Sequence, residues 1–311
     1  MNQSKNLFTS LFVALIMVTA CSPYEEFIED FDYSIVYFGT QKPLRTIVAY
    51  DDMSFKVGVA LGGKRTNAVN ETVGFEIDPS LLDDPAIVGD NLFELMPSDY
   101  YEIDGQEMVV PVGKFIGDVT VKLNTNLFTA DPQATQNHYA IPIRIKNATT
   151  DSVATGAFDD TGNVITAPKD YTIVVVKYIS PLHGTYYRQG IQKEFDEAGE
   201  ELEEVTYNDP DLIKNATWNI QTVDRYSVST PGFGNFNNGA LLLSLDPETN
   251  QVTISTESPA IVGLSGQGTY DPVSRVFQLD YSFQREGRDY QVSEKLTIRQ
   301  APELDLRFEE W

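Results

Sequence analysis

The sequence predicts an all-β protein built from two domains, and three observations predict it. Apolar and polar residues alternate with a period of two in many short segments, which places the apolar residues on one face of a strand. No segment shows a convincing 3.6-residue period over three turns; residues 194–205 come closest, but their charges do not gather on one side. Proline, glycine and aspartate punctuate the alternating segments at short intervals, as turns require.

The first domain, expected over residues 33–178, takes its strands from four such segments. Residues 53–59 and 119–123 each place their apolar side chains on one face. Residues 139–145 form another alternating strand, and Pro142 predicts an edge position or a bulge for it, because proline cannot donate to a ladder. The run 171–178 is apolar on both faces and therefore predicts a central strand.

The second domain is expected over residues 182–311, because Pro181 and Gly184 interrupt the chain before a new strand. An acidic block at 193–205 predicts a solvated hairpin with its turn at Ala198-Gly199. Two further hairpins turn at Asp-Pro pairs, because proline presets φ while the aspartate caps backbone amides. These pairs are Asp246-Pro247 and Asp271-Pro272. A meander of this kind suits a small barrel or a second sandwich.

Composition excludes one class of partner. The chain of 311 residues carries 46 acidic and 22 basic side chains, a formal net charge of −24. Such a surface repels polyphosphate, so nucleic acid is not an expected partner. The chain has a single cysteine, Cys21, so no disulfide can hold the fold and its stability must come from core burial.

The N-terminus predicts export and anchoring. Residues 1–20 combine Lys5 with a short apolar run and read as a signal peptide, too short to span a bilayer stably. The stretch 18–21, Val-Thr-Ala-Cys, resembles the lipobox of bacterial lipoproteins, which implies that Cys21 is lipidated and becomes the N-terminus. The alternative is an ordinary signal peptide with an incidental cysteine.

Residues 21–32 read as an acidic, hydrated tether between the anchor and the first domain. The acids after Cys21 are similar to the surface-export signal of Bacteroidota lipoproteins; they are Glu25, Glu26, Glu29 and Asp30. The resemblance implies that the protein is lipid-anchored in the outer membrane and faces the cell exterior.

A wider resemblance covers residues 33–300. The stretches SIVYFGT, FELMPSDYYEI, MVVPVGKFIGDVTVKL and HYAIPIRIKNAT resemble the N-terminal domain of Bacteroides surface lipoproteins from polysaccharide-utilisation loci. The stretches LHGTYYRQG and SGQGTYDPVSRVFQLDYSFQREGRDYQVSEKLTIRQ are similar to a C-terminal β-domain often paired with it. The resemblance implies an immunoglobulin-like β-sandwich followed by a small calycin-like barrel or sandwich. It also implies glycan capture beside a TonB-dependent importer and its partner lipoproteins.

Catalytic motifs are not evident, and we expect neither an enzyme nor a cofactor. The two histidines, His138 and His183, lie far apart in sequence, and no metal-ligand or nucleophile-elbow spacing occurs. With 46 acids, some pair will reach glycosidase separation by chance, so carboxylates alone indicate nothing. A calcium ion at the acidic block 193–205 remains an alternative, although the EF-hand spacing is missing.

Aromatic residues of the second domain are the candidates for glycan binding, because sugar rings stack on flat side chains while their hydroxyls bond polar groups. The loop 229–240 places two phenylalanines among glycines and asparagines, and for these rings binding and packing are both open. For Trp218, core packing is the favoured alternative. The candidates are Trp218, Tyr226, Phe233, Asn235, Phe236 and Asn237.

The sequence also suggests a modification site and a function. Asp151-Ser152-Val153 resembles the Bacteroidota O-glycosylation motif, which makes Ser152 a candidate acceptor. The leading function is a non-catalytic, cell-surface glycan-binding lipoprotein. The alternative function is structural or adhesive, as a fimbrial subunit or scaffold that assembles by strand exchange at an open sheet edge.

Overall fold

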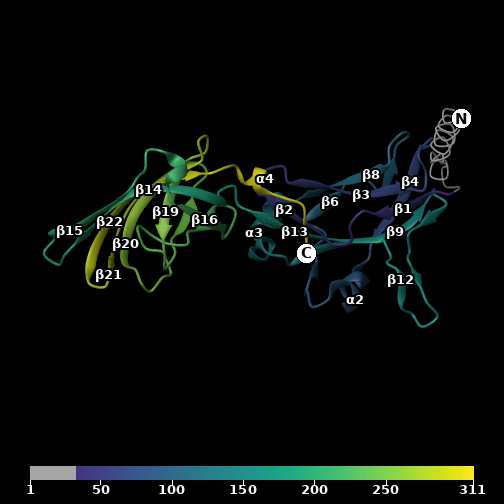
Figure 1. Ribbon diagram of the computed structural model, residues 1–311, viewed down its shortest axis with the longest axis horizontal. Coiled ribbons are helices and arrows are strands. Elements are labelled where there is room, and N and C mark those ends of the chain that lie inside the picture. The colour runs from purple at the N-terminus through teal and green to yellow at the C-terminus, as the bar shows by residue number, and fades with distance from the viewer. Residues whose placement is uncertain (1–32) are drawn as a thin grey trace, which may run out of the picture.

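The computed structural model describes residues 33–311, so the predicted signal peptide, the lipidation site Cys21 and the acidic tether lie outside the described residues. Two β domains follow each other along the long axis of the molecule (Figure 1). The predicted all-β class is confirmed, since no helix within 33–311 exceeds six residues. None of these helices has the length and apolar character needed to cross a bilayer.

One curved sheet forms most of the first domain. Its strands are β1 (Ile35–Phe38), β2 (Pro43–Val48), β3 (Ser54–Gly62), β4 (Glu71–Ile77), β5 (Glu94–Leu95), β6 (Tyr101–Ile103), β7 (Glu107–Val110), β8 (Ile116–Leu123), β9 (Tyr139–Ala148), β10 (Ser152–Val153) and β13 (Tyr171–Ile179). The hydrogen-bonded order is β10-β1-β3-β8-β7-β4-β9-β13-β2. A separate hairpin projects from the domain and pairs β11 (Ala157–Phe158) with β12 (Val164–Thr166).

The sheet curls around one apolar core, so that its two halves face each other as in a sandwich. Alternate residues of both halves meet there, from Val57 and Val121 on one side to Ile141 and Val176 on the other. The strand β13 is central, between β9 and β2, as its two apolar faces predict. The edge position or bulge predicted at Pro142 is wrong, because β9 is internal and Pro142 pairs in regular register with Ile173 of β13. The proline is tolerated because it falls between the pairings of β4 and β5 with the other side of β9, where no ladder donor is needed.

Short helices flank this sheet. They are η2 (Pro79–Leu82), α2 (Pro85–Val88), α3 (Thr125–Ala130) and η3 (Pro132–Thr135). The first two pack on the outer face of β13, and α3 and η3 add Phe128 and Ala134 to the main core. Aspartate or asparagine caps each N-terminus; Asp84, for example, accepts from the Ala86 amide at 2.9 Å. Leu81 and Val88 pack with Ile173 and Val175, so the second apolar face of β13 is also buried.

The second domain is a closed barrel with one added strand. Its strands are β14 (Gly184–Phe195), β15 (Glu201–Tyr207), β16 (Thr217–Thr222), β17 (Ser227–Ser229), β18 (Leu242–Leu245), β19 (Gln251–Ser255), β20 (Val262–Asp271), β21 (Val276–Arg285) and β22 (Arg288–Ile298). The meander closes because β14 pairs with β22 over ten residue pairs, from Tyr186↔Ile298 to Phe195↔Asp289. The sequence predicts a small barrel or a sandwich for the second domain, and the structure shows the barrel.

The predicted hairpin turns are confirmed in the barrel. Asp246 and Asp271 each accept a backbone amide two residues ahead, at 2.9 Å. The acidic block forms the hairpin β14–β15, and Gly199 occupies its turn with a φ of 82°. The edge of β14 is shared, since its first half pairs with β16 and its second half with β15. A short helix, η4 (Leu212–Lys214), connects these two partners.

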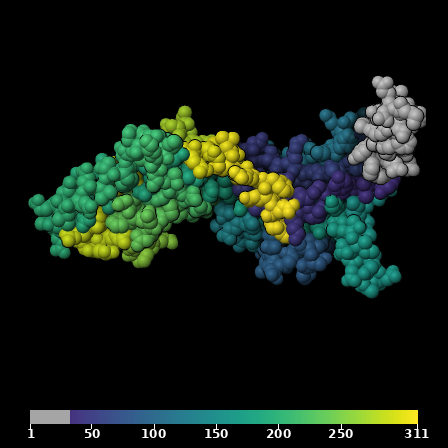
Figure 2. All heavy atoms as spheres, in the orientation of Figure 1, coloured from purple at the N-terminus to yellow at the C-terminus, as the bar shows by residue number. Residues whose placement is uncertain are grey.

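The last residues of the chain return to the first domain. After α4 (Pro302–Asp305), the short strand β23 (Glu309–Glu310) pairs with β2, and the Trp311 indole Nε1 donates to the carbonyl of Ile173 at 2.8 Å. Figure 2 shows this tail lying across the first domain. The predicted domain range 182–311 assigned these residues to the second domain. They instead cover the edge of β2 in the first domain, a contact that their position in the sequence does not reveal.

Candidate functional site

The loop 229–240 closes one end of the barrel from within. Phe233 is fully buried and packs edge-to-face on Phe283, with ring centroids 5.1 Å apart. Phe236 is half-buried, between Tyr290 and the Arg285 guanidinium, which lies 4.2 Å from the ring centroid. The loop folds inward because a barrel of this width must fill its interior with side chains. Phe233 is therefore a core residue, and Phe236 packs against Tyr290 and Arg285 with part of its ring at the surface.

Trp218 is also part of the barrel interior, as the packing alternative predicts. Its indole is 5% exposed and lies 3.7 Å, ring centroid to Cζ, from the Arg188 guanidinium. Arg188 in turn donates to Glu294 at 2.8 Å and to the carbonyl of Gly234 in the closing loop. Trp218 therefore packs against a buried ion pair inside the barrel.

Two tyrosines complete this buried network. The hydroxyl of Tyr281 donates to Glu294 at 2.9 Å, and the hydroxyl of Tyr207 donates to it at 3.0 Å. Burial raises the pKa of Glu294 above its ordinary value, while Arg188 and the two hydroxyls favour the ionised carboxylate. Arg188, Glu294 and both tyrosine hydroxyls are all hydrogen-bonded within this network. Because Arg188 and Tyr281 also bond the backbone of Gly234, the network holds the loop 229–240 against the barrel wall.

The remaining candidates are scattered. Asn235 and Asn237 are exposed at the loop tip, and the Asn235 amide donates to Gln192 at 2.7 Å. Tyr226 is half-buried next to Arg225 at the junction between the domains. Ser152 lies in β10, partly buried beside β1, far along the chain from the barrel. The structure thus brings together only the loop residues and Trp218.

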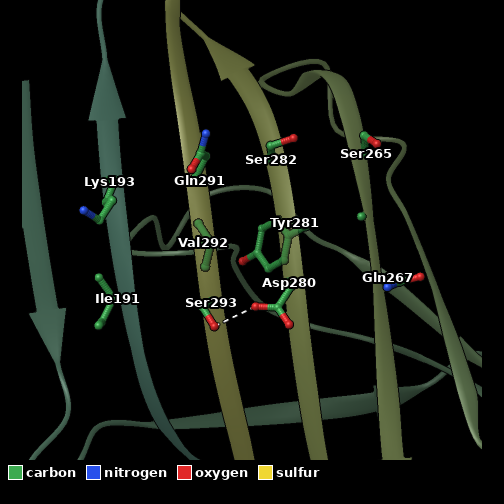
Figure 3. Close-up of a pocket in the computed structure, with 11 residues that line it drawn as sticks. Ile191, Lys193, Ser265, Gln267, Asp280, Tyr281, Ser282, Gln291, Val292 and Ser293 are labelled. Carbon is green, nitrogen blue, oxygen red and sulfur yellow. Dashed lines mark hydrogen bonds between the residues drawn. The ribbon is translucent and has the colours of Figure 1, made fainter. Parts of the chain in front are cut away.

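A polar groove lies on the outside of the barrel. It has a volume of about 770 Å³ and crosses β14, β22, β21 and β20. These strands are ten to twelve residues long. Along β21 and β22, buried core residues alternate with outward residues, most of which are polar. Figure 3 shows the outward side chains in two rows across the strands.

The register of the strands builds each row. In one row Lys193 pairs with Gln291, which pairs with Ser282 and then Ser265 on β20. In the next row the order is Ile191, Ser293, Asp280 and Gln267. Ser293 donates to Asp280 at 2.7 Å, which the dashed line in Figure 3 marks. The Glu201 and Glu204 carboxylates hold the Lys193 ammonium and raise its pKa.

A second hollow of about 560 Å³ continues the groove along the same strands. It shares Ile191, Asp280 and Ser293 with the first and adds polar side chains farther along the strands, among them Gln189, Asn208, Gln278 and Lys295. Hydroxyl, carboxamide, carboxylate and ammonium groups therefore line an open surface that extends beyond a single hollow. Such a surface can hydrogen-bond an extended, hydroxyl-rich molecule.

The two histidines occupy separate sites. His138 lies 3.5 Å from Glu94 in the first domain. His183 lies at the domain junction, where its Nδ1 accepts from the Thr222 amide at 3.2 Å. Within residues 33–311, no cluster of three or more potential metal-ligating His, Cys, Asp or Glu side chains occurs.

Sequence reasoning missed the outer groove because its residues look like ordinary outward positions of alternating strands. The available signal was the outward row itself, in which Gln278, Asp280 and Ser282 alternate with the core residues of β21. It also missed the Arg188–Glu294 pair, because the two residues lie 106 positions apart.

Comparisons with known proteins agree with this architecture. A protein-family profile described as “-like, N-terminal domain” matches residues 31–152. No curated protein matches the sequence significantly. Among solved structures, a Bacteroides ovatus protein of unknown function is 22% identical, with a TM-score of 0.76 over 90% of this chain and 99% of that chain. This likeness shows that the two proteins share the two-domain fold.

Two other solved structures are less similar. One is a second Bacteroides ovatus protein of unknown function, 13% identical with a TM-score of 0.42 over 90% of this chain and 100% of that chain. The other is an auxiliary nutrient binding protein from Bacteroides thetaiotaomicron, 14% identical with a TM-score of 0.40 over 86% of this chain and 95% of that chain. At these TM-scores the similarity supports no statement about the present chain.

Proposed function

We propose that this protein is a non-catalytic, cell-surface glycan-binding lipoprotein that captures polysaccharide for a TonB-dependent importer. The observation that carries the proposal is the outer groove of the barrel, about 770 Å³ and lined by two rows of hydrogen-bonding side chains. Sugar hydroxyls both donate and accept, and so do the serine hydroxyls and glutamine amides of these rows. The groove is open, so a polymer can lie across it without threading through the protein.

The expected affinity is low. Ile191, 38% exposed, gives the apolar face of a sugar ring one contact, and Tyr281 turns its ring into the barrel. Without stacking rings, binding depends on hydrogen bonds that replace those to water, each contributing about 0.5–1.5 kcal/mol. We expect dissociation constants in the micromolar to millimolar range.

The arrangement of the domains suits capture away from the membrane. β1 lies at the end of the first domain remote from the barrel (Figure 1). A chain anchored through Cys21 would therefore present the barrel outward, where a polymer outside the cell can reach it. Changing Cys21 to Ala should release the protein from membrane fractions, and retention of that variant would contradict the anchor.

The proposed role is binding without hydrolysis. Glycosidases use two carboxyl groups about 5–10 Å apart around the bond that they cleave. Asp280 is the one carboxylate among the residues that line the main groove, and it is hydrogen-bonded to Ser293. A single acid in this position can bind a sugar hydroxyl but does not form the catalytic pair.

Affinity electrophoresis against a panel of polysaccharides tests the proposal. The protein should be retarded by at least one glycan without depolymerising it. Gln291→Ala and Asp280→Ala should each weaken retardation two- to tenfold, the equivalent of one lost hydrogen bond. Gln106→Ala, at an exposed turn of the first domain, is the control and should bind like the wild type. Groove variants that fold and bind unchanged would place the site elsewhere.

A structural role is the second candidate, and the C-terminal tail favours it. β23 covers the edge of β2 with only two residue pairs, so exchange of this tail between molecules could link subunits. Retardation by no glycan, together with concentration-dependent oligomers that disappear when residues 306–311 are removed, would favour this role over glycan binding.

A further inference from the structure

Another groove, separate from the outer groove and its extension, lies between the two domains. It has a volume of about 510 Å³, and three parts of the chain line it: β2 and β13 of the first domain, the strands β14 and β16 of the barrel, and the C-terminal tail. None of the sequence-based candidates falls in it. Because both domains and the tail contribute, the groove exists only in the complete fold.

Basic groups gather in this groove although the chain carries a net charge of −24. Lys177, Arg299 and Arg307 line it together with His183, while the acids on the same wall are Asp305 and Glu309. Arg299 lies 3.6 Å from Asp305, so one acid is already paired. Three cations against two acids make this a local exception to the acidic surface.

Two of the cations have no carboxylate partner in the part of the chain that the structure describes. Within residues 33–311, no acid lies within the 4.0 Å ion-pair distance of the Lys177 ammonium or the Arg307 guanidinium. Lys177 is half-buried on β13, opposite Thr46 of β2. A half-buried ammonium without a counter-charge is a site where an anion gains binding energy.

Neutral donors adjoin these cations. Asn219 accepts from the Thr185 hydroxyl through its Oδ1 at 2.7 Å, so its amide N–H groups remain free to donate toward a ligand. Gln221 lines the same wall and is exposed. Cations beside amide donors are the combination that binds a charged sugar, whose anionic group needs the first and whose hydroxyls need the second.

We propose that the groove between the domains binds the anionic group of an acidic saccharide, a carboxylate or a sulfate ester. The inference rests on the proposed function for the saccharide and adds to it a second subsite with a charge preference. Lys177 and Arg307 contact the anion, and Asn219 bonds a neighbouring hydroxyl. A polymer with both neutral and acidic units could then engage the outer groove and this one together.

His183 provides a direct readout, because the chain has only two histidines. Burial lowers the pKa of His183, Lys177 lowers it further, and Asp305 opposes them. Arg299, Arg307 and Glu309 face the same space. An anion bound beside Lys177 must raise the pKa of His183, whereas His138, in the first domain beside Glu94, should not respond.

The experiment is an NMR titration of both histidines with trigalacturonate, galactose 6-sulfate, neutral galactotriose and inorganic sulfate. An acidic sugar that binds should raise the pKa of His183 and leave that of His138 unchanged. Comparing trigalacturonate with galactose 6-sulfate distinguishes a preference for a carboxylate from one for a sulfate ester. Lys177→Gln combined with Arg307→Gln should weaken that binding roughly tenfold, as expected for losing charge-assisted hydrogen bonds. Lys177→Arg should retain it.

The matched control is Lys56→Gln with Lys122→Gln, which removes two exposed cations of the first domain and should leave binding unchanged. Melting temperatures establish that each variant folds. If glycans are retarded but acidic sugars move His183 no more than galactotriose or inorganic sulfate, this inference fails and the proposed function stands. If no saccharide of either kind is bound, both fail.

Discussion

The buried ion pair of the barrel gives a prediction whose size follows from the structure. The Arg188 side chain is 6% exposed and the Glu294 side chain is 0% exposed, with Nη2 and Oε1 2.8 Å apart. Arg188→Met keeps an unbranched apolar side chain against Trp218 but leaves Glu294 without its counter-charge. Breaking one partner of a buried pair costs about 3–5 kcal/mol, so we expect that loss in the free energy of unfolding of the barrel.

Tryptophan fluorescence in urea measures this loss. The chain has two tryptophans, Trp218 inside the barrel and Trp311 on the first domain, so a Trp311→Phe background reports the barrel alone. With a slope of about 2 kcal/mol per molar urea, the unfolding midpoint should fall by about 2 M. Arg288→Met is the control, because Arg288 lies 3.7 Å from Glu194 at the surface and contributes less than about 1 kcal/mol.

A double variant decides whether the pair is coupled. Arg188→Met with Glu294→Leu removes both charges, and replacing both members of a buried pair usually costs far less than breaking it. The double variant should therefore be more stable than Arg188→Met alone. If its loss equals the sum of the two single losses, the residues act independently and the reasoning is refuted.

Three further predictions concern the closing loop, the junction and the tail. Phe233→Ala should lower the free energy of unfolding by about 3–5 kcal/mol in urea denaturation and leave glycan retardation unchanged, because the ring is core. His183 has a lowered pKa in the fold, so the unfolded chain binds its proton more readily; stability should fall as the pH drops below about 6.5, by at most about 1.4 kcal/mol per unit. His183→Gln should flatten that part of the pH profile in thermal melts, and an identical profile would contradict the assignment. Trp311→Ala removes the hydrogen bond to Ile173 and should speed proteolysis within residues 300–311, measured by mass spectrometry; an unchanged rate would show that this indole does not hold the tail.

Local patterns predicted the elements of this fold well, because strands and turns depend on near neighbours. The alternation in residues 53–59 and 119–123 gave strands β3 and β8, which pair with each other in the structure. The Asp-Pro pairs gave hairpin turns, since the bond that caps each turn spans two residues. Pro142 misled the prediction, because the strand that contains it is internal and the proline lies at a local gap in the pairing on one side.

The candidate sites were harder to predict, because exposure depends on the whole barrel. A loop rich in glycine and asparagine is polar in composition, yet Phe233 is fully buried within it. Its backbone could enter the barrel because Arg188 and Tyr281 satisfy the carbonyl and amide of Gly234. Those partners come from β14 and β21, which no local pattern connects with the loop.

The sequence by itself determined the all-β class, the apolar face of each strand and the main hairpins, since all of these follow from spacing within ten residues or so. Tertiary structure alone decided that the second domain closes into a barrel, through the pairing of β14 with β22. It also decided that the tail returns to β2 and that Lys177 and Arg307 meet in one groove. The physical reason is that side-chain period specifies a face, whereas closure, edge pairing and convergence of charges depend on contacts between residues far apart in the chain.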